Sequence, residues 1–157
     1  MMLHFAYGSN MSRALMRRYA PAAVPIGAAA LADHRFIITA DGYGSVQPMR
    51  AEIVHGILWR LTPRDRVSLD AWENIAAGLY RAGTLPVRLA GRRRLALVYI
   101  ARPRGLGRAK PGYMELVVAA AREWKFPSAY ISTLQDWLPA PPCVASGART
   151  RKLGEFR

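Results

Sequence analysis

The stretch Leu3-His4-Phe5-Ala6-Tyr7-Gly8-Ser9-Asn10 opens the chain with a hydrophobic run that stops at a glycine. An apolar and aromatic run of this kind is typical of a buried strand. Ser9 or Asn10 is expected to cap a helix that runs through Tyr19, because both side chains accept hydrogen bonds from free helix amides. Pro21 ends that helix, since proline cannot continue it. The sequence therefore predicts a strand, a tight turn and a helix in close succession.

The turn at Gly8 can hold a ligand as well as redirect the chain. A glycine lets a ligand approach the backbone closely. The amides of Gly8, Ser9 and Asn10 are expected at the N-terminus of the helix, where unpaired N–H groups bind a carboxylate or an oxyanion. The same spacing also fits a simple strand-to-helix turn with an asparagine cap, and the spacing alone leaves both interpretations open.

The rest of the chain combines short strands with a few helices. Apolar and β-branched residues gather in four segments, which predicts strands at residues 34–40, 52–61, 79–89 and 94–101. Start signals and helical spacing predict helices at residues 62–72, from Pro111 and from Ser128, which acts as a cap. Short, numerous strands favour an α+β fold, either a small mixed β-barrel or a curled mixed sheet, with helices packed outside.

Local signals define the ends of some of these elements. Thr62, Pro63 and Asp65 together form a helix start with a capping box. Ala90-Gly91 predicts a hairpin turn between the last two strands. Pro86 lies inside the first of them, so we expect a sheet edge or a bulge there, because proline donates no hydrogen bond to a neighbouring strand.

Glu73 is the carboxylate whose surroundings best suit chemistry. It follows a predicted helix and stands between Trp72 and Ile75. Apolar neighbours remove water from a carboxylate and raise its pKa, which suits proton transfer. An exposed glutamate at a helix end is the alternative, and the local sequence does not decide between the two.

The composition is that of one compact domain. The chain has 157 residues, of which 52% are hydrophobic and 21% are charged. We expect one domain at residues 1–139 and a basic, mobile tail at residues 140–157. Cys143 is the single cysteine, so no internal disulfide forms and a reducing compartment fits. Neither a secretion signal nor a membrane-spanning run is visible, and we expect a cytoplasmic protein with no membrane partner.

The net charge of +13 indicates anionic partners without choosing among them. The excess gathers at residues 92–94, 102–110 and 149–157. No nucleic-acid-binding motif accompanies these residues, so a solvated basic surface is favoured over nucleic-acid binding. His4, His34 and His55 lack the spacing of metal ligands, and no metal site is predicted.

A series of motifs resembles the γ-glutamylcyclotransferase family, which includes the AIG2-like proteins. The similar segments are residues 5–10, with the Tyr-Gly-Ser-Asn signature, then residues 54–59, 69–73, 78–80, 111–113 and 126–130. The resemblance spans residues 3–138. Asn10 after Ser9 points to the branch with the Tyr-Gly-Ser-Asn turn, and Asn74 stands where related enzymes often have glycine.

This resemblance implies a mixed barrel, often a homodimer, with no metal and no organic cofactor. It implies that the α-amine of a γ-glutamyl group attacks its own γ-carbonyl and releases 5-oxoproline and a free amine or amino acid. The substrate is then a small anionic γ-glutamyl compound. Glu73 matches the catalytic glutamate, and the expected substrate-binding residues are Tyr7, Gly8, Ser9, Asn10, Tyr80 and Tyr113.

Two other functions remain open at the level of the sequence. The same fold can serve as a non-catalytic binder of a metabolite or a partner protein. The basic charge also allows nucleic-acid binding, which would be salt-dependent. The intact turn together with Glu73 favours the enzyme over both.

Overall fold

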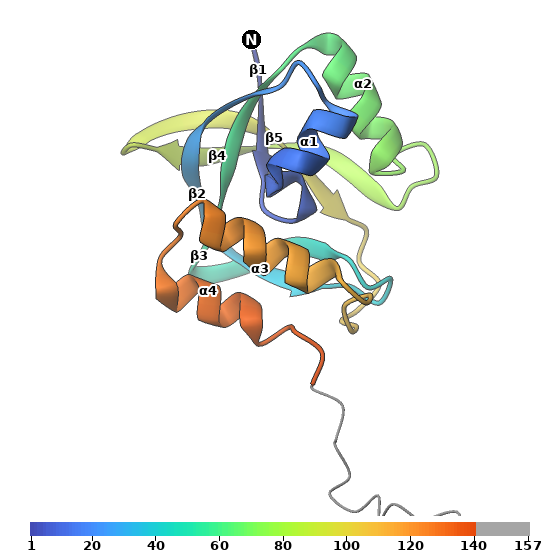
Figure 1. Ribbon diagram of the computed structural model, residues 1–157, viewed down its shortest axis with the longest axis vertical. Coiled ribbons are helices and arrows are strands. Elements are labelled where there is room, and N and C mark those ends of the chain that lie inside the picture. Colours follow the sequence, from blue (N-terminus) through green and yellow to red (C-terminus); the bar gives the residue numbers. More distant parts are fainter. Residues whose placement is uncertain (141–157) are drawn as a thin grey trace, which may run out of the picture.

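The computed structural model describes residues 1–140, and five strands within this part of the chain close into a barrel (Figure 1). Their order around the barrel is β1-β3-β2-β4-β5. The strands are β1 (Met2–Ala6), β2 (Val24–Ile38), β3 (Gly44–Leu61), β4 (Tyr80–Leu89) and β5 (Arg92–Ala101). All pairs are antiparallel except β1 with β5, which run parallel and close the barrel at His4 and Leu97.

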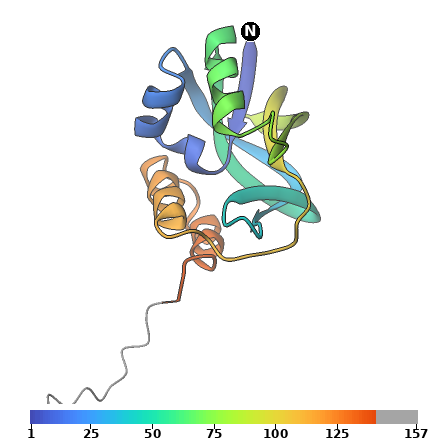
Figure 2. The same cartoon turned by 90° about the vertical axis from the view of Figure 1, so that its right-hand side faces the viewer.

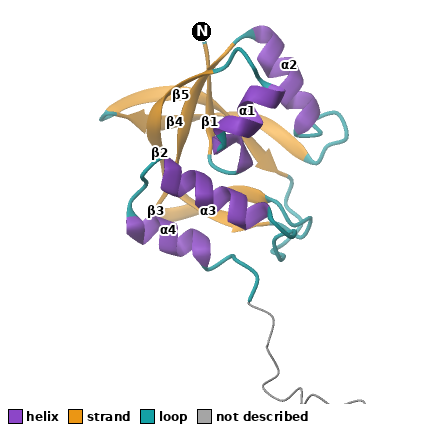
Figure 3. Cartoon of the chain, in the orientation of Figure 1, coloured by secondary structure: helices purple, strands orange, loops and turns teal. Residues whose placement is uncertain are grey.

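Helices pack on the outside of this barrel (Figure 3). They are the 3₁₀ helix η1 (Ser9–Met11) and the α-helices α1 (Arg13–Tyr19), α2 (Pro63–Trp72), α3 (Tyr113–Glu123) and α4 (Ser128–Gln135). In Figure 2, α1, α3 and α4 lie on the same side of the strands. The predicted α+β barrel with outer helices is confirmed. Most of the predicted tail lies outside the described residues.

The first helix begins later than the sequence predicts. Residues 8–12 form a 3₁₀ turn, in which the Met11 amide donates to the Gly8 carbonyl across 3.0 Å. The cap of α1 is Ser12, whose Oγ accepts from the Leu15 amide at 3.3 Å. Ser9 and Asn10 are therefore not the cap, because the extra turn carries the Asn10 side chain inward instead.

The strands β2 and β3 are much longer than predicted. Residues 24–33 of β2 are mostly small or polar, so they lack the β-branched run that marks the second half. They form a strand because all of them except Ile26 and Asp33 pair with residues of β3, as in Ala28 with Ile57 and Leu31 with Val54. Asp33 and Ala51 adopt positive φ where the long hairpin bends, and the Asp33 carboxylate accepts from the Ala51 amide at 2.9 Å.

The structure also tests the other local sequence signals, and it confirms some of them and not others. The capping box of α2 is confirmed, since Thr62 and Asp65 exchange side-chain to backbone hydrogen bonds. Pro86 pairs with Leu95 of β5, while β4 meets β2 only at Arg88, so Pro86 lies on an open edge as predicted. The prediction that Ser128 caps α4 is wrong, because Ser128 is already helical and makes no cap hydrogen bond.

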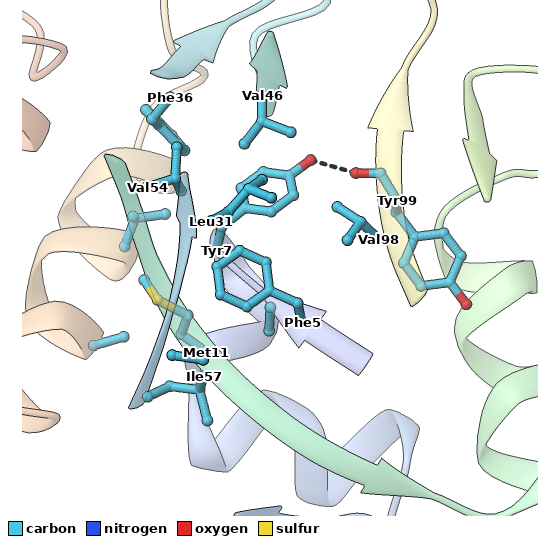
Figure 4. Packing of buried hydrophobic residues seen from close by; sticks show 14 of the residues in the cluster. Phe5, Tyr7, Met11, Leu31, Phe36, Val46, Val54, Ile57, Val98 and Tyr99 are labelled. Carbon is cyan, nitrogen blue, oxygen red and sulfur yellow. Dashed lines mark hydrogen bonds between the residues drawn. The ribbon is translucent and has the colours of Figure 1, made fainter. Parts of the chain in front are cut away.

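The core fills the barrel interior and the space beneath the helices. Figure 4 shows Phe5, Met11 and Ile57 packed together, with the Tyr7 hydroxyl directed at the backbone of Tyr99. Among residues 1–140, no helix combines the length and hydrophobicity that crossing a bilayer requires.

Candidate active site

A cavity of about 610 Å³ lies between the Gly8 turn, the end of α2 and the start of α3. The structure brings every residue that the sequence nominated to its walls. These residues are Tyr7, Gly8, Ser9, Asn10, Glu73, Tyr80 and Tyr113. They come from four separate elements, so the barrel is what places the Gly8 turn opposite Glu73.

Glu73 caps the C-terminus of α2 and faces the cavity. Its amide donates to the Leu69 carbonyl at 2.8 Å, which fixes the backbone in the last turn of the helix. Its Oε1 accepts a hydrogen bond of 2.9 Å from Asn10 Nδ2. Burial raises the pKa of Glu73 from 4.5 to about 7, while the Asn10 hydrogen bond opposes that rise. The carboxyl group can therefore both accept and return a proton near neutral pH.

Asn10 is itself buried, with 5% of its surface exposed. Its Nδ2 is committed to Glu73, and its Oδ1 is buried without a hydrogen-bond partner among the described residues. An asparagine in this position keeps a donor on Glu73 whether that carboxylate is charged or neutral.

The backbone after Glu73 turns sharply toward β4. Asn74 has φ of 53°, in the left-handed region that asparagine tolerates better than most residues. The Leu79 amide donates to the Asn74 carbonyl at 3.3 Å and closes the loop. Asparagine thus adopts at this position the left-handed conformation that glycine adopts most readily.

Three tyrosines form the polar walls of the cavity. The Tyr80 hydroxyl donates to the Gly44 carbonyl at 2.6 Å, and the Tyr7 hydroxyl donates to the Tyr99 carbonyl. The Tyr113 hydroxyl lies against Gly8 and Gly44, since a Cβ built at either glycine would be 2.6 Å from it. Burial raises the pKa of all three phenols well above their ordinary value, so they remain donors at neutral pH.

Tyr99 joins the two sides of the cavity. Its carbonyl accepts from Tyr7, next to the Gly8 turn, and its hydroxyl donates to Asp70 Oδ1 at 2.7 Å, one turn before Glu73. The Arg66 guanidinium bonds the same Asp70 oxygen at 2.8 Å. Burial and the Asp70 carboxylate raise the pKa of Tyr99, so this hydroxyl also keeps its proton.

The sequence did not nominate several residues that line the cavity. They are His4, Tyr43, Gly44, Trp72, Tyr99 and Lys110, among others. For Tyr43 and Gly44 the sequence did hold a signal, because the glycines at 42 and 44 mark a tight turn around an aromatic side chain. His4 is buried, its Nδ1 contacts the Leu97 carbonyl at 3.1 Å, and desolvation lowers its pKa to about 4, so it stays neutral.

Within residues 1–140, no three His, Cys, Asp or Glu side chains gather as a metal ligand set would. The polar groups at the cavity include one carboxylate, tyrosine hydroxyls, turn amides, the side-chain amides of Asn10 and Asn74, and the Lys110 ammonium. This set suits a small molecule that carries both a carboxylate and an amine.

The family described as AIG2-like matches residues 53–134, more than half of the chain. The chain belongs to the AIG2-like family. This match includes Glu73, Tyr80 and Tyr113, and the resemblance noted from the sequence is confirmed at the family level. A comparison with curated proteins finds no match.

Solved structures share the AIG2-like fold of this chain. One described as a gamma-glutamyl cyclotransferase has a TM-score of 0.82 at 21% identity, over 88% of this chain and 89% of its own. An uncharacterized protein from Homo sapiens has a TM-score of 0.82 at 22% identity, over the same shares. YkqA from Bacillus subtilis has a TM-score of 0.73 at 23% identity, over 89% of this chain and 56% of its own.

Proposed function

We propose that this AIG2-like protein is a γ-glutamyl cyclotransferase that converts a γ-glutamyl amino acid or amine to 5-oxoproline. The observation that carries the proposal is the hydrogen-bonded pair of the buried Asn10 and the partly buried Glu73 at the cavity, with the pKa of Glu73 raised to about 7. The family match and the fold shared with a gamma-glutamyl cyclotransferase support it.

The reaction is intramolecular, so the protein's main task is to fold the substrate. Holding the α-amine against the γ-carbonyl removes most of the entropy cost of ring closure, which can be worth several kcal/mol. The walls formed by Tyr80 and Tyr113 limit the poses available to a γ-glutamyl chain. A compact, ring-closing pose is the one that brings the amine toward Glu73.

Glu73 then moves the protons that ring closure requires. It takes one proton from the substrate's α-ammonium, and the free amine attacks the γ-carbonyl carbon. Glu73 returns that proton to the leaving nitrogen as its bond to the carbonyl carbon breaks. The extra proton on the new ring nitrogen passes to the solvent. A single group with a pKa near 7 performs both transfers without a large energetic penalty.

The Gly8 turn is the proposed site for the negative charge of the substrate or of the tetrahedral oxygen. The amides of Met11 and Ser12 already donate within the turn. The amides of Gly8, Ser9 and Asn10 are therefore the ones proposed to bind the charge. The missing side chain at Gly8 leaves room for the Tyr113 hydroxyl beside the same position.

The test is 5-oxoproline release from a panel of γ-glutamyl amino acids and amines. Glu73→Gln keeps the shape of the side chain and is expected to lower turnover on the order of 10²–10⁴-fold. Glu115→Gln is the matched control, because Glu115 is exposed on α3 and lies outside the cavity lining. Wild-type turnover that survives in Glu73→Gln contradicts the catalytic role. Tight binding without turnover in the wild type would indicate a non-catalytic binder instead.

A further inference from the structure

An acidic and a basic side chain both line the cavity. Glu73 is partly buried beside Asn10, whereas Lys110 is exposed at the opening. Among the described residues that line the cavity, Lys110 is the only lysine or arginine. A ligand that reaches from Glu73 to the opening therefore meets a positive charge at its outer end.

Lys110 is held in place by a turn that fits its stem. Its amide donates to the Gly42 carbonyl at 3.0 Å, and a Cβ built at Gly42 would be only 2.6 Å from Lys110 Cγ. The lysine stem thus packs against a position without a side chain. In Figure 2 the loop that carries Lys110 runs along the outside of the molecule past the turn between β2 and β3.

The ammonium group lies next to an aromatic wall of the cavity. Lys110 Nζ is 5.7 Å from the centroid of the Tyr43 ring, within the range of a cation–π contact. Tyr43 in turn packs edge-to-face on Tyr113, with ring centroids 5.5 Å apart. Among the described residues the Lys110 ammonium makes no ion pair, so its charge is available to a ligand.

The cavity has space for more than a γ-glutamyl group. A volume of about 610 Å³ is in the range that encloses drug-sized ligands. The γ-glutamyl part must reach Glu73 and the Gly8 turn, so the leaving group occupies the outer part. Trp72, Leu116 and Pro111 line the cavity and are exposed, as Lys110 is.

We propose that Lys110 binds a carboxylate on the leaving group, and that the preferred substrates are γ-glutamyl amino acids or peptides rather than γ-glutamyl amines. The inference rests on the proposed cyclotransferase activity. A carboxylate on the released amine places a negative charge at the opening, where Lys110 can reach it. Because Lys110 is exposed, this preference should weaken as the salt concentration rises.

Two substrates that differ only in that carboxylate test the proposal. They are γ-glutamylalanine and γ-glutamylethylamide. Lys110→Met is expected to lower kcat/KM about 10-fold for the alanine compound, mainly through KM, and less than about 2-fold for the ethylamide. Lys110→Arg should keep most of the preference. Arg108→Met is the matched control, since Arg108 is exposed on the same loop but does not line the cavity.

An equal loss for both substrates in Lys110→Met overturns the proposal, because Lys110 would then contact the γ-glutamyl part. No loss for either also overturns it.

A binding measurement separates this proposal from the catalytic one. In the Glu73→Gln background, the fluorescence of Trp72 at the cavity can report binding of both compounds. A roughly 10-fold preference for the alanine compound that disappears in Lys110→Met supports the carboxylate site even if no 5-oxoproline forms. Equal affinity for the two compounds in the background protein contradicts it.

Discussion

The Tyr99 hydroxyl donates to Asp70 Oδ1 across 2.7 Å, and this bond ties β5 to the helix that ends at Glu73. The Tyr99 carbonyl also accepts from Tyr7, so one residue of the barrel contacts both sides of the proposed active site. Because Asp70 and Glu73 lie on adjacent turns at the end of α2, the bond limits how that end can move.

Tyr99→Phe should therefore weaken catalysis without touching the proton-transfer group itself. We expect kcat to fall about 10-fold, with a smaller change in KM, because a misplaced carboxylate affects ring closure more than binding. Steady-state kinetics on a γ-glutamyl substrate measure both values. Tyr130→Phe is the control, because the buried Tyr130 hydroxyl has no hydrogen-bond partner among the described residues. An unchanged kcat in Tyr99→Phe would show that the tether has no positioning role.

The rate should follow the ionisation of Glu73. Its pKa of about 7 predicts that kcat/KM rises with pH and levels off above neutrality, because only the carboxylate accepts a proton. The Asn10 hydrogen bond lowers this pKa, so Asn10→Leu should move the inflection to higher pH. A pH profile of kcat/KM from pH 5 to 9 checks both statements. An inflection that stays in place in Asn10→Leu would mean that another group controls the profile.

Local chemistry made parts of this fold predictable. The capping box at Thr62 and Asp65 depends on residues three positions apart, and the structure has it as predicted. The strand before Gly8 and the hairpin at Ala90-Gly91 also follow from neighbouring residues. The Ser12 cap was missed, because several polar residues follow Gly8 and only the tertiary contact of Asn10 with Glu73 decides among them.

The site was predicted only in part, for a related reason. The resemblance to a family nominated Glu73 and the Gly8 turn, and the structure brings them to one cavity. Tyr43 and Lys110 were not predicted as site residues, because their position at the cavity opening depends on long-range contacts, such as the hydrogen bond from the Lys110 amide to the Gly42 carbonyl. The small residues in the first half of β2 were missed since pairing with β3, rather than propensity, makes them a strand.

Glu73 should also make stability depend on pH. Its pKa is raised from 4.5 to about 7 by folding, so the folded protein binds this proton more tightly than the unfolded chain. The contribution of this bound proton to the free energy of unfolding is fully present below pH 4.5 and is lost as the pH rises through 7. The free energy of unfolding of Glu73→Gln, measured relative to that of the wild type, should therefore increase on the order of 1–3 kcal/mol as the pH rises from 4 to 8.

Urea unfolding of both proteins at several pH values measures this difference. Glu115→Gln should track the wild type, because that carboxylate is exposed. A constant difference between wild type and Glu73→Gln across the range would show that Glu73 is not desolvated in the folded protein.

The contact between Gly8 and Tyr113 makes a prediction about packing. A Cβ at residue 8 would be 2.6 Å from the Tyr113 hydroxyl oxygen, whereas the next nearest atom, Tyr113 Cζ, would be 3.9 Å away. Gly8→Ala should therefore destabilise the fold by about 1–3 kcal/mol, the range for overpacking a buried site. Tyr113→Phe removes the clashing oxygen, so the double variant should recover most of the loss. Thermal unfolding of the four proteins gives the coupling energy, and strictly additive effects would show that the two residues do not meet.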